Sequence, residues 1–89
     1  VTRPVHFWPF DGWKIPAGSS AVAEVYPRLW NRHYPQAEGR TADQHDAWVV
    51  AEWMRAADLD GRLATALMPQ LDPPERRIAE VEGWILGVE

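Results

Sequence analysis

The sequence contains no cysteine, which excludes a disulfide, a thiolate zinc site and a thiol nucleophile. It has no apolar run long enough to cross a membrane and no signal-peptide pattern, so we expect a cytoplasmic protein with no membrane partner. Basic residues are outnumbered, nine Lys and Arg against thirteen Asp and Glu. The resulting net charge of −4 does not support broad electrostatic binding of nucleic acid, although a metal-dependent nuclease has an acidic active site of its own.

The chain is short, and residues 1–89 suffice for a single small domain. It opens without Met or an evident first element, which fits a fragment, a processed product or a trimmed chain. The pattern predicts only two strands, which make a poor sheet, so we expect a fragment of a larger domain. It nevertheless carries six Trp, more than one small core can easily enclose. Trp48 falls on the polar side of its predicted helix, which leads us to expect a packing surface from outside that face. The missing N-terminal part of the same domain or a second copy in a homo-oligomer would supply it.

Apolar patterning predicts an α/β fold of two strands followed by three or four helices. The segment Val5–Phe10 is rich in β-formers and aromatics. The segment Ala21–Tyr26 is a nearly continuous apolar run, typical of a strand covered on both faces. The direction in which the two strands pair is left open by the ten or so residues between them.

The helical part begins with a short helix from Pro27, which ends near Pro35. The main helix is expected from Thr41 to about Ala57, because residues 41–44 form a capping-box pattern. A brief helix follows over residues 62–68. The last helix is predicted to run from Pro73 to about Leu86, with Asp72 as its N-cap and Gly87 as its stop.

Asp46 is the first candidate functional residue, because it lies on the apolar arc of the main helix with Val50, Trp53 and Ala57. An unpaired ionised carboxylate is costly in such a place, so we expect either a site role or a buried Asp–Arg pair. Asp43 lies one turn earlier, where the helix dipole alone can account for it. His45 falls towards the polar face and is expected to be solvated.

Glu24 is the second candidate, since it interrupts the strand run on the side of Val22 and Tyr26. It either reaches solvent or an Arg at the strand end, or converges with Asp46 on one site. Such oxygen-only clusters suit Mg²⁺ or Mn²⁺, which activate water for phosphodiester cleavage. Glu82 intrudes on an apolar arc of the last helix, formed by Ile78, Val81, Ile85 and Leu86. A structural role for Glu82 as an anchor for Arg is favoured over that of a third ligand.

Four segments of the chain together resemble a bacterial family of unknown function, predicted to be nucleases with a ribonuclease H-like fold. They are AEVYP (Ala23–Pro27), RTADQHDAW (Arg40–Trp48), EGWILGV (Glu82–Val88) and HFWPFDGW (His6–Trp13). The resemblance is to the C-terminal part of such a domain. It covers most of this chain and about the last third of a family member.

The resemblance implies a metal-dependent nuclease in which Asp46 and Glu24 are catalytic metal ligands and Asp43 is an auxiliary ligand. Asp46-Ala47 is similar to the last acidic position of Holliday-junction resolvase-like nucleases, and Glu24 matches the acidic residue of a late strand. The family's Asp on the first strand has no counterpart here, so we expect this chain alone to be inactive. The alternative is a non-catalytic protein-interaction or homodimerisation module that uses an exposed Trp surface, chiefly Trp8, Trp13 and Trp48.

Overall fold

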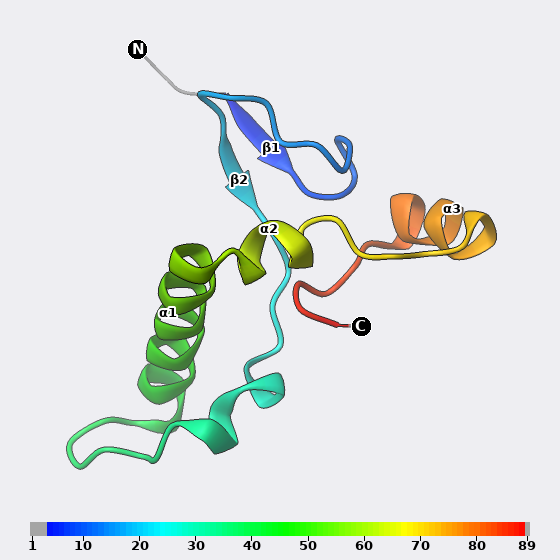
Figure 1. The fold of residues 1–89 in the computed structure, drawn as a ribbon. Coiled ribbons are helices and arrows are strands. Elements are labelled where there is room, and N and C mark those ends of the chain that lie inside the picture. Colours follow the sequence, from blue (N-terminus) through cyan, green and yellow to red (C-terminus); the bar gives the residue numbers. More distant parts are fainter. Residues whose placement is uncertain (1–3, 89) are drawn as a thin grey trace.

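The computed structural model describes residues 4–88 and combines helices with a small sheet (Figure 1). Its elements are the strands β1 (Val5–Phe7) and β2 (Ser20–Val22), the 3₁₀ turns η1 (Pro27–Leu29) and η2 (Asn31–His33), and the helices α1 (Ala42–Asp60), α2 (Arg62–Ala66) and α3 (Pro73–Glu82). This order agrees with the predicted succession of two strands and three or four helices. No helix within residues 4–88 is both long enough and apolar enough to span a bilayer.

The two strands pair in parallel, with Phe7 opposite Val22. The ladder includes a hydrogen bond of 3.0 Å from the Trp8 N–H to the Val22 carbonyl. β1 is shorter than predicted because the chain turns at the cis Trp8–Pro9 peptide bond. Asp11 then closes the outer edge of β1, since its carboxylate accepts from the Phe7 N–H and its own N–H donates to the Phe7 carbonyl, both at 2.8 Å.

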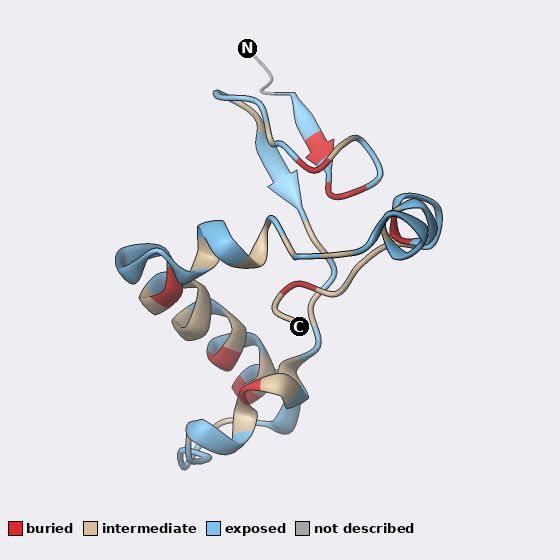
Figure 2. Cartoon of the chain, turned by 45° about the vertical axis from the view of Figure 1, so that its right-hand side comes forward, coloured by how far each residue is buried: buried red, intermediate tan, exposed pale blue. Residues whose placement is uncertain are grey.

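The prediction that the second strand is covered on both faces is wrong. All three residues of β2 are exposed, and Figure 2 shows this strand in pale blue along its length. In Figure 1 the sheet projects beyond the helices rather than lying between two layers. An apolar run therefore does not reveal, by itself, whether other elements are present to cover it.

Helix α1 begins as predicted, because Thr41 and Gln44 form both hydrogen bonds of the capping box. It continues past Ala57 to Asp60 and ends at Gly61, whose φ of 87° suits glycine. The expectation that His45 is solvated is wrong. His45 is buried, and its Nε2 donates to the Tyr34 carbonyl at 3.0 Å, so it belongs to the face that α1 packs against the preceding segment.

Helix α3 starts as predicted, with the Asp72 side chain accepting from the Glu75 N–H at 2.9 Å. It ends at Glu82 instead of Leu86, because the chain adopts a φ of 97° at Gly83 and turns back. The predicted apolar arc on this helix is consequently wrong: Ile78 and Val81 are exposed. The C-terminal segment instead runs beside the chain that follows β2, where the Leu86 N–H donates to the Glu24 carbonyl at 3.0 Å.

Indole rings form much of the core. Trp8 and Trp13 meet edge to face, with ring centroids 5.6 Å apart, and both join Ala79 and Leu86 in a buried cluster. Trp30, which follows η1, stacks on Trp53 of α1 with centroids 4.1 Å apart and planes 11° from parallel. These contacts join segments that are distant in sequence and so hold the sheet, the main helix and the C-terminal segment together.

We predict that Gly87→Ala destabilises the protein more than Gly39→Ala. Both glycines have a positive φ, 90° and 84°, so the backbone cost of Ala is similar. A Cβ at position 87 would also lie 2.8 Å from Cζ2 of Trp30, whereas nothing lies within 4 Å at position 39. The loss of unfolding free energy should be larger by about 1–3 kcal/mol for Gly87→Ala, measured by urea denaturation. Equal losses would show that Trp30 is not tightly packed there.

Candidate functional site

The predicted carboxylates lie on two parts of the fold, Asp43 and Asp46 on α1 and Glu24 on the segment after β2. Glu24 is exposed, and its backbone pairs with Ile85 of the C-terminal segment. Asp43 is exposed in the first turn of α1, where the helix dipole favours a negative charge. Asp46 is half-buried in the next turn and forms no ion pair with any residue between 4 and 88, so the expected alternative of an Asp–Arg pair is not formed.

The donor atoms of these residues suit Mg²⁺ or Mn²⁺, since both ions prefer carboxylate oxygen. Their arrangement does not assemble a metal centre. Within residues 4–88 no three His, Asp or Glu side chains come together in a way that could hold an ion. Glu82 is exposed near the end of α3 and forms no salt bridge with another described residue, so the predicted Arg anchor is absent as well.

The predicted Trp surface is largely absent, because Trp8 and Trp13 are buried. Each also has a partner for its indole N–H. Trp8 donates to the Leu67 carbonyl at 3.2 Å, and Trp13 donates to the Glu80 carboxylate at 3.0 Å. Buried indoles with satisfied donors belong to the core of this chain, so neither residue is available to an interface.

Trp48 is partly exposed, and the surface that covers the rest of its ring comes from the chain itself. Tyr34 meets the ring edge to face, with centroids 5.5 Å apart. The Arg40 guanidinium lies over the ring, 4.4 Å from its centroid. The segment that precedes α1 therefore packs against Trp48. The prediction that missing chain or a second copy supplies this surface is wrong.

Exposed apolar side chains lie next to one another on the sheet, besides single ones on other elements such as Leu59 and Val81. Val5, Phe7 and Val22 are 51%, 52% and 50% exposed. The parallel register places Phe7 beside Val22, and the alternation of side chains puts Val5 on the same side as Phe7. We call Val5, Phe7 and Val22 the apolar sheet face. The apolar pattern of the sequence predicted the two strands. It did not predict that one face of the sheet would be exposed.

A cleft of about 530 Å³ lies elsewhere, among the end of η1, the α1–α2 junction and the C-terminal segment. Its walls include Trp30, Trp53 and Trp84, and its polar residues include Arg62 and Gln70. The excess of Trp was the sequence signal for this cleft. The positions of Trp30, Trp53 and Trp84 in the sequence did not predict that the three residues would line the same cleft.

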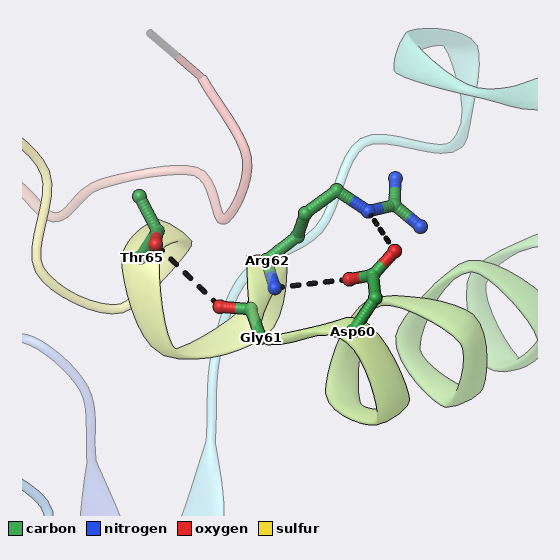
Figure 3. A network of polar contacts seen from close by, with 4 residues as sticks. All are labelled: Asp60, Gly61, Arg62 and Thr65. Atoms are coloured by element: carbon green, nitrogen blue, oxygen red, sulfur yellow. Dashed lines mark hydrogen bonds and ion pairs between the residues drawn. The ribbon is translucent and has the colours of Figure 1, made fainter.

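The α1–α2 junction orients Arg62 through Asp60 (Figure 3). The backbone N–H of Arg62 donates to one carboxylate oxygen at 3.0 Å, and its Nε donates to the other at 2.7 Å. These two hydrogen bonds, the backbone one first, lower the pKa of Asp60 below its ordinary value. The paired carboxylate of Asp60 fixes the base of the Arg62 guanidinium.

The chain matches no protein-family model, no curated protein and no solved structure. Any assignment of function therefore depends on the residues and surfaces described above.

We predict that Arg62→Gln raises the pKa of Asp60 part of the way to its ordinary value. The substitution removes the side-chain hydrogen bond and keeps the backbone one. Because the folded-state pKa is the lower one, this interaction stabilises the fold above the unfolded-state pKa and is lost as pH falls through the folded-state value. Carboxyl carbon shifts followed by NMR against pH report the change.

Arg55→Gln is the matched control, since Arg55 is an exposed Arg that pairs with Glu52 on the same helix. It should leave the Asp60 titration unchanged. An Asp60 that titrates identically in the Arg62→Gln variant would contradict the pairing at the junction.

Proposed function

We propose that this chain is an interaction module that forms homodimers through the apolar sheet face. The observation that supports the proposal is the exposure of Val5, Phe7 and Val22 together on one side of the sheet. Scattered apolar residues are normal on protein surfaces, but these three are neighbours in a paired register. The three side chains together form a surface suited to association.

A two-stranded sheet is too small to be stable by itself, and sheets commonly gain stability by packing face to face about 10 Å apart. A second copy stacked on the apolar sheet face would remove the half-exposed side chains of both copies from water. Burial of this kind is worth about 25 cal/mol per Å² of apolar surface. The hydrophobic effect therefore provides the driving force for the dimer.

The charge on this face is also compatible with a second copy. Glu24 follows Val22 on the same side and lies at one end of the face. In a two-fold dimer the same patch contacts itself, so stacked strands that run in opposite directions hold the two Glu24 carboxylates at opposite ends. The centre of the interface is then apolar and free of like-charge repulsion.

We predict that Val22→Lys weakens dimerisation by about tenfold or more, because a charged group replaces apolar surface at the centre of the interface. Sedimentation equilibrium over a range of protein concentrations measures the association constant. Val81→Lys is the control, since Val81 is an apolar residue of α3 that is 78% exposed and lies outside the sheet. Dimerisation that Val81→Lys weakens and Val22→Lys does not would assign the interface to α3, and a wild-type monomer throughout would refute the proposal.

As a second function we propose that the chain contributes carboxylates to a metal-dependent nuclease of the ribonuclease H-like class. The supporting observation is Asp46, a half-buried carboxylate with no ion-pair partner among the described residues. Mg²⁺ or Mn²⁺ bound there would supply activated water for phosphodiester hydrolysis. Glu24 and Asp43 are the other ligands of this proposal, and because no three such side chains come together within residues 4–88, further ligands would have to come from outside these residues.

We predict for this second function that Mn²⁺ broadens the amide signals around Asp46 selectively, and that Asp46→Asn abolishes the effect because it removes a ligand charge. Asp58→Asn is the control, since Asp58 is an exposed Asp of the same helix. An NMR titration of both variants makes the comparison. Broadening that persists in Asp46→Asn would contradict a metal role for Asp46.

A further inference from the structure

We propose that the cleft between the α1–α2 junction and the C-terminal segment binds a small planar aromatic carboxylate. Its volume of about 530 Å³ falls within the range of about 300–1,000 Å³ that is typical of small-molecule sites. It is separate from the apolar sheet face and from Asp46. This binding site does not depend on either proposed function.

The indole walls of the cleft favour a ligand with a planar aromatic ring. Trp30 and Trp53 are held in a parallel stack, so their rings are already ordered before any ligand arrives. Trp84 lines the cleft from the C-terminal segment. The half-buried Trp53 and Trp84 provide most of the apolar contact area for an aromatic ring, because Trp30 is buried against Trp53, and ordered indoles bind without a further loss of side-chain entropy.

The polar groups of the cleft select for an acceptor oxygen. The Gln70 side-chain amide is a hydrogen-bond donor in the lining. A donor in a mostly apolar wall favours a ligand that carries an acceptor oxygen over one that is wholly apolar.

Arg62 selects for a negative charge. Its Nε is bound to Asp60, and its two terminal nitrogens make no hydrogen bond to any residue between 4 and 88 (Figure 3). Asp60 thus orients the guanidinium and leaves the outer part of the fork free. A planar carboxylate matches that fork with two parallel hydrogen bonds, which gives both affinity and orientation.

The test is a titration of the intact chain with 2-naphthoate and with its neutral analogue 2-naphthamide, followed by NMR of the six indole N–H signals. We expect 2-naphthoate to shift the signals of Trp30, Trp53 and Trp84, with those of Trp8 and Trp13 unchanged. The amide should bind about tenfold more weakly, because it lacks the charge that Arg62 recognises.

Arg62→Gln should remove the difference between the two probes, because it removes the charged fork and keeps the aromatic walls. Arg55→Gln, an exposed Arg outside the cleft lining, should leave the difference unchanged. Three results would overturn the proposal: equal affinity of the two probes for the wild type, an unchanged preference in Arg62→Gln, or shifts confined to Trp48 or to Trp8 and Trp13.

Discussion

The fold depends on the packing of indole rings, because Trp8, Trp13 and Trp30 are the bulkiest of the buried apolar side chains in the described core. Trp8 and Trp13 join the turn after β1 to α3 and the C-terminal segment, and Trp30 joins the 3₁₀ turns to α1. Each ring buries a large area but needs a fitting neighbour, which explains why Gly87 lies against Trp30. Of these rings, Trp30 both completes the core and lines the cleft.

The sequence predicted the local structure well wherever a single turn of chain determines it. The capping box at Thr41 and the N-cap at Asp72 are confirmed, since both are hydrogen bonds within three residues. The sequence-based prediction was wrong where contacts between residues distant in sequence determine burial or the end of a helix. His45 is buried because Tyr34 lies against it, and the last helix stops at Gly83 because the chain turns back to pair beside Glu24. Neither contact can be predicted from the apolar and polar pattern of the helix concerned.

In the candidate sites, too, the sequence predicted local features and missed those that depend on tertiary contacts. The positions of Asp43 and Asp46 on their helix followed from periodicity, whereas the burial of Trp8 and Trp13 and the wall formed by Trp84 required the tertiary structure. Periodicity assigns a residue to one side of an element but does not reveal what covers that side. The exposed sheet and Asp46, which has no ion-pair partner among the described residues, are both features that a further surface would complete. The proposed homodimer would supply such a surface for the sheet.

The most direct test of the homodimer is an isotope-filtered NOE experiment on a mixture of labelled and unlabelled chains. Such an experiment detects contacts between copies and ignores those within one copy. The proposed interface predicts intermolecular NOEs from the Val22 and Val5 methyl groups to the Phe7 ring. Intermolecular NOEs confined to Val81 and Ile78 of α3, or none in a sample that sediments as a monomer, would contradict it.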